Sequence, residues 1–427
     1  MNVAEKIRRI YDRRPYPFGS AKALKHRSWT LNLEWVEAIA GSEAFFGTPI
    51  RILMAGCGSG SEAFQMRRRL PKAAIVAVDF SARSIALAKR LQRRDRKMRD
   101  IRFVVGDLAD PRLPVRLGGK FDLIICHGVL SYIPRAERAM RNFARCLTPT
   151  GALYLGVNGS RHLNTRLRLV LPEFGYDVNV YRESARLRDT LRLCDAVTTA
   201  DGLPRVSGLG QEFLSSDVFG SLNRSLALPR WVSLGRRAGL HFRGNSSSIR
   251  QFRRITEEGL HTLLIPRSRA QVCEFLERLS PSQFHRLVLS RKPEANPPWE
   301  SRRELLSWRI VLSRLYTFRL PRPGRVVRDR LRRVGIASPA LALSMEWLMP
   351  EWELELLRRG RGRRSVGSVL ATVPLLVPFR EIQKQLYLLY NLGVIGLLPP
   401  PAGARPVRGS AGRDSPAAGA AARARTR

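Results

Sequence analysis

The sequence predicts an α/β protein with a doubly wound parallel sheet. Two observations lead to this prediction. Short apolar runs of strand length alternate with stretches of helical length over residues 50–157, and a glycine-rich turn joins the first apolar run to the first helical stretch. Continuous apolar runs are typical of parallel strands buried on both faces. Because parallel neighbours need a crossover between them, the alternation indicates right-handed βαβ units.

The expected elements follow in order along the chain. Strands are predicted at 50–55, 73–78, 101–105, 121–126 and 152–157, with helices at 61–69, from Ser81 to about 93, and at 135–146. Ser81 is expected to cap its helix, because a serine hydroxyl accepts a hydrogen bond from a free N–H of the first turn. After an irregular segment at 160–229 come a helix at 230–238 ended by Gly239, a strand at 240–243, helices at 249–258 and 269–279, and a closing edge strand at 284–290.

The composition is that of a globular protein with an unusually basic surface. The 427 residues are 44% hydrophobic and 26% charged, and 75 lysines and arginines face 35 aspartates and glutamates, which gives a net charge of +40. No apolar stretch reaches the roughly 20 residues of a membrane span, and residues 1–10 are too charged for a secretory signal. Five scattered cysteines predict neither disulfides nor a zinc or other metal site. We therefore expect a cytoplasmic protein.

The charge leaves two interpretations open. Basic surface neutralises phosphate, so a nucleic-acid partner is one hypothesis. The arginine clusters, however, lie in separate segments such as 67–69, 93–99, 328–333 and 358–364, without the interleaved aromatic residues that stack on bases. A generic basic surface is the favoured interpretation.

The glycine-rich turn carries the first chemical signal. Ala55-Gly56-Cys57-Gly58-Ser59-Gly60 follows the first strand, so backbone N–H groups of the next helix can approach a ligand closely. Asp79 ends the second strand 19 residues after Gly60, where a carboxylate accepts hydrogen bonds from a ribose. Those two features suit NAD and other adenosyl ligands alike. Ser61 stands where the dinucleotide pattern GxGxxG requires glycine, and Asp107 follows the third strand, which favours an adenosyl ligand without a pyrophosphate.

Four motifs together resemble a class I S-adenosylmethionine-dependent methyltransferase: ILMAGCGSG at 52–60, VDFS at 78–81, GDL at 106–108 and FDLIICHGVLSYI at 121–133. The closer resemblance is to a bacterial group with an N-terminal Pro-Tyr-Pro segment, here residues 15–17, and an AGCGTG-type glycine motif. It covers about residues 1–298 and implies a Rossmann-like seven-stranded sheet.

The resemblance implies which residues hold the cofactor, S-adenosyl-L-methionine. Gly56, Cys57, Gly58 and Gly60 would contact its methionyl and ribose part, Asp79 the ribose and Phe80 the adenine. Asp107 and Leu108 would bracket the adenine edge, and His127 with Gly128 would line the floor beneath the sulfonium. The sequence departs from the family in two ways: Met54 replaces a frequent acidic residue, and Ser131 and Tyr132 replace a pair of histidines.

No catalytic residue follows from the motifs. Tyr16, His127 and Tyr132 are the candidates, and Asn158 and His162 could reach the same pocket mouth. A packed histidine at a strand end is as good an interpretation of His127 as a catalytic one. The methyl acceptor, a small molecule or a protein side chain, stays unidentified; the alternative is a nucleic-acid-binding protein or an RNA or DNA methyltransferase.

Four segments are expected: an N-terminal cap at 1–45, the methyltransferase domain at 46–298 with an insertion at about 160–229, a helical domain at 299–398, and a disordered tail at 399–427. Helices at 349–359, 365–372 and 381–392 make the third segment resemble a winged-helix module. This module could bind a partner or support a dimer.

Overall fold

The computed structural model describes residues 3–16, 24, 33–40, 49–199, 205–220, 222–313, 316–320, 331–338, 343–359, 364–373 and 377–401. The expected disordered tail lies outside these residues from position 402 onward, as does most of the expected cap between positions 17 and 48.

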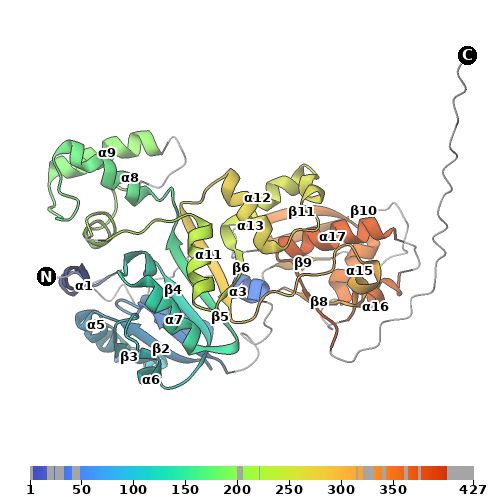
Figure 1. The fold of residues 1–427 in the computed structure, drawn as a ribbon, viewed down its shortest axis with the longest axis horizontal. Coiled ribbons are helices and arrows are strands. Elements are labelled where there is room, and N and C mark those ends of the chain that lie inside the picture. Colours follow the sequence, from blue (N-terminus) through green and yellow to red (C-terminus); the bar gives the residue numbers. More distant parts are fainter. Residues whose placement is uncertain are drawn as a thin grey trace, which may run out of the picture.

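A seven-stranded sheet forms the centre of the first two thirds of the chain (Figure 1). Its strand order is β3-β2-β1-β4-β5-β7-β6. The strands are β1 (Arg51–Ala55), β2 (Ala74–Asp79), β3 (Arg102–Val105), β4 (Phe121–His127), β5 (Leu147–Asn158), β6 (His241–Asn245) and β7 (Phe284–Ser290). The first five run parallel, and β7 is antiparallel to both of its neighbours. The predicted Rossmann-like sheet is thus confirmed.

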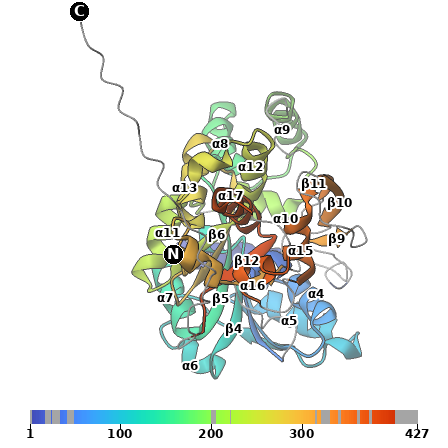
Figure 2. The same ribbon diagram turned by 90° about the vertical axis from the view of Figure 1, so that its right-hand side faces the viewer.

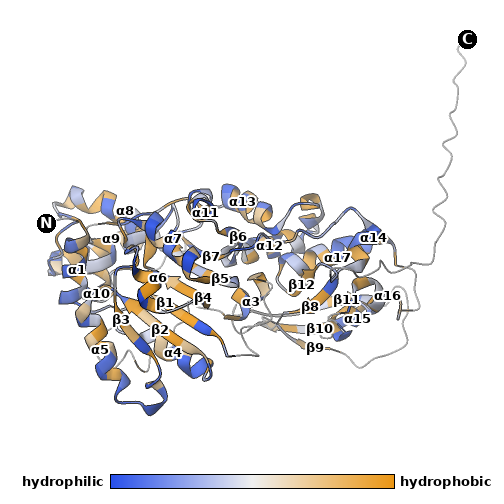
Figure 3. Cartoon of the chain, turned by 60° about the horizontal axis from the view of Figure 1, so that its bottom comes forward, coloured by the Kyte–Doolittle hydropathy of each residue, from blue (hydrophilic) through white to orange (hydrophobic). Residues whose placement is uncertain are grey.

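Two hydrophobic cores, one on each face, hold the sheet. The first contains apolar side chains of α3 (Leu33–Ala40), α4 (Ser61–Arg69), α5 (Ala82–Gln92) and α12 (Ser246–Glu257). The second contains those of α6 (Leu113–Leu117), α7 (Ala136–Cys146) and α11 (Leu228–Arg237). Side chains of α13 (Arg269–Leu279) enter both cores. The central strands β1 and β4 are apolar along most of their length because both of their faces are covered (Figure 3).

Several expected elements have the predicted bounds or differ by a few residues. Helices α4 and α13 and strand β7 begin and end where predicted, and Ser81 caps α5 by accepting from the Ser84 N–H at 3.1 Å. The prediction that 284–290 forms the edge strand is wrong, because β7 lies between β5 and β6. The edge position belongs to β6, whose short sequence hid its place in the sheet.

The insertion after β5 is more helical than its sequence indicated. It contains α8 (Leu163–Val170), α9 (Ala185–Thr198), α10 (Gln211–Phe213) and the short helices η3 (Leu171–Phe174) and η4 (Leu214–Val218). A third, separate hydrophobic core formed by residues such as Leu167, Leu191 and Phe219 holds them together. Helix η4 contacts α1 (Val3–Arg13), so the insertion meets the N-terminal helix.

The C-terminal region combines helices with two small sheets. Strands β9 (Thr317–Arg319), β10 (Leu331–Ser338) and β11 (Leu343–Pro350) form one sheet, and β8 (Arg309–Leu312) pairs with β12 (Ile395–Leu398). The helices are α14 (Arg302–Ser307), α15 (Glu351–Arg359), α16 (Val366–Leu370) and α17 (Phe379–Asn391). The three expected helices are present, but the expected start of the first at position 349 is wrong because β11 continues to Pro350. The antiparallel pair β10–β11 was not predicted.

The described residues of the C-terminal region share a hydrophobic core with the first part of the chain. Figure 2, seen from this end, shows α15, α16 and α17 in front of the sheet. Their apolar side chains belong to the same core as α3 and α12. The Tyr387 hydroxyl also donates to the Leu264 carbonyl at 2.9 Å, and the Arg269 guanidinium donates to the Tyr390 carbonyl at 2.8 Å.

Within the described ranges, no helix combines the length and the apolar character that crossing a bilayer requires.

Candidate active site

The glycine turn between β1 and α4 has a backbone that only glycine adopts readily. Gly56, Gly58 and Gly60 have φ values of 80°, 51° and 88°. A Cβ on Gly56 would lie 2.4 Å from a methyl carbon of Val129, so the turn passes directly against the segment that follows β4. The N–H groups of Gly56 and Cys57 both donate to the Val78 carbonyl, at 2.7 and 2.9 Å. The carboxyl ends of β1, β2 and β4 are therefore drawn together at this turn.

Asp79 is buried beside the turn, with a side chain that faces it. One carboxylate oxygen accepts from the Gly58 N–H at 2.8 Å, and the other accepts from the Ser81 N–H at 2.9 Å. Burial raises the pKa of Asp79 to about 6, although these N–H groups favour the ionised form. Since a carboxylate oxygen accepts more than one hydrogen bond, the group keeps acceptor capacity for hydroxyls of a ligand.

The neighbouring strand end supplies the second carboxylate. Asp107 follows β3 and is half-buried; one of its oxygens accepts from the Ala109 N–H at 2.8 Å, and the other lies 3.7 Å from the Arg135 guanidinium. Leu108 next to it is buried. The expected adenine-bracketing pair thus stands at the same edge as Asp79.

The N-terminal helix α1 covers the outer side of this edge. The Ser81 hydroxyl donates to Asp12 at 2.6 Å, and the Ser59 N–H donates to the Tyr16 carbonyl at 2.9 Å. The ring of Tyr11 meets the half-buried ring of Phe80 edge-on, with centroids 5.7 Å apart. The segment with the Pro15-Tyr16 motif therefore packs on the glycine turn and on the residue expected at the adenine.

His127, at the end of β4, is a packed and uncharged histidine. Its Nδ1 lies 3.2 Å from the Tyr154 hydroxyl, and its ring contacts Phe284 with centroids 5.1 Å apart. Burial, with a smaller contribution from Arg286, lowers the pKa of His127 to about 3. A proton carried at neutral pH is therefore not available from this side chain. His162 is similar: burial lowers its pKa to about 4, and it caps α8.

A buried polar cluster lies where the insertion meets the segment after β4. Its centre is Asp217 of η4, a side chain that is 8% exposed. The carboxyl accepts from the Ser216 hydroxyl at 2.8 Å and is hydrogen-bonded to the Tyr132 hydroxyl. Tyr16 and Tyr11 are close enough that the Asp217 charge, after burial, is the largest influence that raises their pKa values. The cluster unites two of the three catalytic candidates, Tyr16 and Tyr132, and leaves His127 outside.

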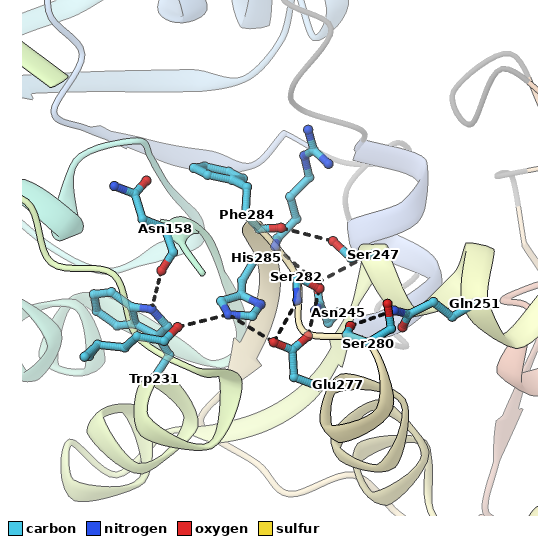
Figure 4. A network of polar contacts seen from close by, with 12 residues as sticks. Asn158, Trp231, Asn245, Ser247, Gln251, Glu277, Ser280, Ser282, Phe284 and His285 are labelled. Atoms are coloured by element: carbon cyan, nitrogen blue, oxygen red, sulfur yellow. Dashed lines mark hydrogen bonds and ion pairs between the residues drawn. The ribbon is translucent and has the colours of Figure 1, made fainter. Parts of the chain in front are cut away.

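Asn158 at the end of β5 fastens this cluster to the sheet. Its side-chain amide donates to the Tyr132 hydroxyl at 3.1 Å and to Asn223 of the insertion at 2.9 Å. Its carbonyl accepts from the Trp231 indole at 3.0 Å, as Figure 4 shows. One asparagine thereby connects β5, the segment after β4 and both the insertion and α11.

The end of the insertion is fixed by a second buried network (Figure 4). The His285 Nε2 donates to the Leu226 carbonyl at 3.1 Å and lies 3.7 Å from Glu277. Glu277 in turn accepts from the Ser282 N–H and hydroxyl at 3.0 and 2.7 Å. Because β7 and α13 hold these groups, the insertion returns to the sheet at a defined position.

The residues at this edge fit an adenosyl cofactor. Two carboxylates and a left-handed glycine turn provide acceptors and a close backbone approach. The hydroxyls of Ser59 and Ser61 in the same turn are buried without a hydrogen-bond partner. A Cβ added to Gly128, directly after β4, would meet no atom within 4 Å, which indicates open space beneath the expected sulfonium position. Among the residues the structure describes, no group of three histidine, cysteine or acidic side chains could hold a metal ion.

Known proteins show the same domain. Residues 53–153 match the sequence model of a family described as a methyltransferase domain. An uncharacterized protein of Synechococcus sp. is 30% identical over 159 residues, which cover 36% of this chain and 37% of that protein. A malonyl-(acyl-carrier protein) O-methyltransferase of Priestia megaterium is 30% identical over 119 residues, which cover 28% of this chain and 40% of that enzyme.

A solved structure extends the likeness of fold. PKMT2 from Rickettsia typhi, in complex with AdoHcy, superposes with a TM-score of 0.52 at 14% identity and covers 87% of this chain and 76% of that chain. This share is more than residues 1–298 alone could supply, so the similar fold includes part of the C-terminal region.

The family match of residues 53–153, within this Rossmann-like sheet, identifies a class I, S-adenosylmethionine-dependent methyltransferase domain in this chain. The chain spans about two fifths of the length of the curated relatives named above.

Two residues of the edge were missed by sequence reasoning. Asp217 lies in no motif; its only signal is a single acidic residue within the apolar stretch from Phe213 to Phe219. Tyr11 falls within the expected N-terminal cap, where no role was predicted for it, and only the fold brings it to Phe80.

Proposed function

We propose that this protein transfers a methyl group from S-adenosylmethionine to an acceptor that is a small molecule or a protein side chain. The observation that carries the proposal is the position of Asp79, buried against the left-handed glycine turn within the matched methyltransferase domain. When bound, S-adenosylmethionine supplies an electrophilic methyl group on a positively charged sulfur.

The chain's own residues would then bind and orient. Asp79 accepts the ribose hydroxyls, the turn with Gly56, Cys57, Gly58 and Gly60 lets the backbone approach the ligand, and Phe80 packs on the adenine. Asp107 and Leu108 bracket the adenine edge, while His127 and Gly128 line the floor. Catalysis then rests mainly on holding the acceptor in line and excluding water.

A titration tests the cofactor assignment. We expect AdoHcy to bind the full chain in isothermal titration calorimetry, and Asp79→Ala to weaken it at least about ten-fold, since a charge-assisted hydrogen bond contributes about 1.5–3 kcal/mol. Asp100→Ala, a carboxyl removed from an exposed loop beyond α5, is the matched control and should bind like the wild type. Absence of AdoHcy binding by the wild type would overturn the proposal.

Turnover decides between the two acceptor classes. Conversion of S-adenosylmethionine to AdoHcy is measured with the small-molecule fraction and, separately, with the protein fraction of a cell extract. The fraction that sustains turnover contains the acceptor. If neither fraction sustains turnover at saturating cofactor, the protein is not an active methyltransferase.

Nucleic acid is the alternative partner and is not favoured. Several arginines of the basic clusters are used within the protein: Arg67 is buried and donates to the Pro71 carbonyl, and Arg358 lies 2.7 Å from Glu351. Arg359 likewise pairs with Glu355. Strong binding of mixed RNA and DNA that weakens steeply with salt would revive this alternative. A cytoplasmic location and a dimer through residues 299–398 remain predictions, the latter checked by sedimentation.

A further inference from the structure

The buried carboxyl of the insertion is placed to meet a methyl acceptor. Unlike Asp79 and Asp107, Asp217 comes from the insertion, and its partners are hydroxyls: Ser216 at 2.8 Å, and Tyr132. Asp79 and Asp107, by contrast, accept from the backbone of their own turns.

Three tyrosines connect Asp217 to the cofactor edge. Tyr132 stands five residues after the end of β4, and its hydroxyl is held by both Asn158 and Asp217. The Tyr16 carbonyl accepts a hydrogen bond from the Ser59 N–H of the glycine turn, and the charges of Asp217 and Asp79 both raise the pKa of the buried Tyr11. Asp217 is therefore linked through Tyr132 to the segment after β4, at the carboxyl edge where the proposed function puts the reacting methyl group.

Asp217 is the acid of this cluster, and its charged and titratable neighbours come from the helices that pack against η4. Helices α1 and α8 pack against η4. From α1 and the segment after it come the uncharged phenols Tyr11 and Tyr16, and from α8 comes Arg168, whose guanidinium is engaged by the carbonyls of Val178, Val218 and Gly220 at 2.7–3.0 Å. Burial is the main influence on Asp217 and raises its pKa to about 7, while the Ser216 and Tyr132 hydroxyls act in the opposite direction.

We propose that Asp217, framed by Tyr132 and Tyr16, is the acceptor-binding residue and that the acceptor is a primary or secondary amine. This inference rests on the proposed function. A buried carboxylate attracts an ammonium group through its charge and through a charge-assisted hydrogen bond.

The chemistry balances without a further reactant. The ammonium group gives one proton to the Asp217 carboxylate, which frees the nitrogen lone pair. The lone pair forms the new N–C bond while the methyl–sulfur bond breaks, and that bond's electron pair stays on sulfur. Asp217 takes the role of general base, for which a pKa near neutral pH is suitable.

Two other acceptor classes are less compatible with this cluster. A carboxylate acceptor, like the one named for the Priestia megaterium relative, would be repelled by the ionised Asp217 and has no proton to give. An alcohol would have to lose a proton of much higher pKa than a carboxyl group can accept efficiently. The amine alone uses both the charge and the proton affinity of Asp217.

Sinefungin tests the inference by binding alone. In this cofactor analogue a carbon bearing a primary amine replaces the methylated sulfur. Its ammonium group therefore takes the position of the reacting methyl group, next to the acceptor site. At pH 8 we expect wild-type protein to prefer sinefungin over AdoHcy in isothermal titration calorimetry. Asp217→Asn should lower this preference about ten-fold or more, as for a lost charge-assisted pair, with AdoHcy affinity unchanged.

The controls separate the inference from the proposed function. Asp189→Asn makes the same change on the exposed face of α9 in the same insertion and should keep the wild-type preference. Wild-type protein that binds neither ligand contradicts the proposed function. Equal preference for sinefungin in wild type and Asp217→Asn, with AdoHcy bound normally, contradicts only the role of Asp217.

A pH series adds an independent measurement and does not require a variant. The preference for sinefungin should fall as pH decreases from 8 to 6, because Asp217 becomes protonated and the ammonium loses its partner. If Asp217→Asn unfolds, Tyr132→Phe is the second variant. This variant removes one hydrogen bond that stabilises the Asp217 carboxylate, so the pKa of Asp217 should rise. As the pH is lowered, the preference for sinefungin should therefore disappear at a higher pH than in the wild type. A preference that does not change with pH contradicts the inference.

Discussion

Replacing Asp79 with asparagine should make the ligand-free protein relatively more stable as the pH rises. The carboxyl is 8% exposed, and burial raises its pKa from 3.8 to about 6. A group whose pKa is raised in the folded state contributes stability below its unfolded pKa, and this contribution is lost as pH increases through the folded pKa. The ionised Asp79 therefore lowers the free energy of unfolding of the wild type at pH 8, whereas asparagine never ionises and has no such effect.

The magnitude follows from the two pKa values. The shift corresponds to about 3 kcal/mol in full, of which about 1.4 kcal/mol falls between pH 5 and pH 8. Urea unfolding of both proteins at pH 5, 6, 7 and 8 gives the difference in free energy of unfolding. Between pH 5 and pH 8, Asp79→Asn should gain about 1.4 kcal/mol in free energy of unfolding relative to the wild type. Most of this change should fall between pH 5 and 6.5.

The difference isolates one residue. Asp217 and Glu353 are also buried acids with raised pKa values, but both proteins contain them, so their contributions cancel. Asp100→Asn, an exposed change, should show no pH-dependent difference from the wild type. A difference between wild type and Asp79→Asn that stays constant from pH 5 to pH 8 would refute the assignment of a costly buried charge. If Asp79→Asn is also found to lose AdoHcy binding, the two results together would show that Asp79 binds the ligand although its charge destabilises the ligand-free fold.

Three further predictions concern packing and protonation. Gly56→Ala should cost about 2–4 kcal/mol in urea unfolding, from a strained positive φ and the contact with Val129, and Val129→Ala in the same chain should restore part of it. The Cε1 proton of His127 should not shift in NMR spectra between pH 8 and pH 5, because its pKa lies near 3; a midpoint near 6.5 would contradict the packed, neutral ring. Arg269→Ala should cost about 3 kcal/mol, because it removes the cation that pairs with the half-buried Glu294 and leaves that carboxylate only the Tyr390 hydroxyl, and faster hydrogen exchange in α17 than in β1 should accompany it.

The sheet and the cofactor edge could be predicted because their signals are local. A strand that is buried on both faces consists of one continuous run of apolar residues. The turn after β1 needs glycines at the three positions that have positive φ. Asp79 could be placed from its spacing alone, since the carboxyl ends of neighbouring parallel strands meet at one edge. Each of these inferences needs only a few consecutive residues.

The C-terminal strands were missed for the opposite reason. Strand β10 begins with Leu331, Arg332 and Arg333 and contains Gly335, so its sequence lacks the alternation typical of a strand. Its register with β11 cannot be read from any local pattern. Met349 and Pro350 were assigned to the following helix because the apolar and acidic residues continue without a break into α15. Tertiary pairing decided between two local conformations that the sequence permits equally.

The same distinction separates the two ends of the candidate site. The cofactor end is built by backbone: the turn, its N–H groups and a carboxylate that they orient. The proposed acceptor end would be built by side chains from three distant segments, with Tyr16 before β1, Tyr132 after β4 and Asp217 in the insertion. Asn158 fixes their relative position through hydrogen bonds to Tyr132 and Asn223. Because the insertion has its own hydrophobic core, its residues could change without disturbing the turn that holds the cofactor. A replaced Asp217 would then alter which acceptor is bound while AdoHcy affinity stays the same, which is the separation that the sinefungin titration measures.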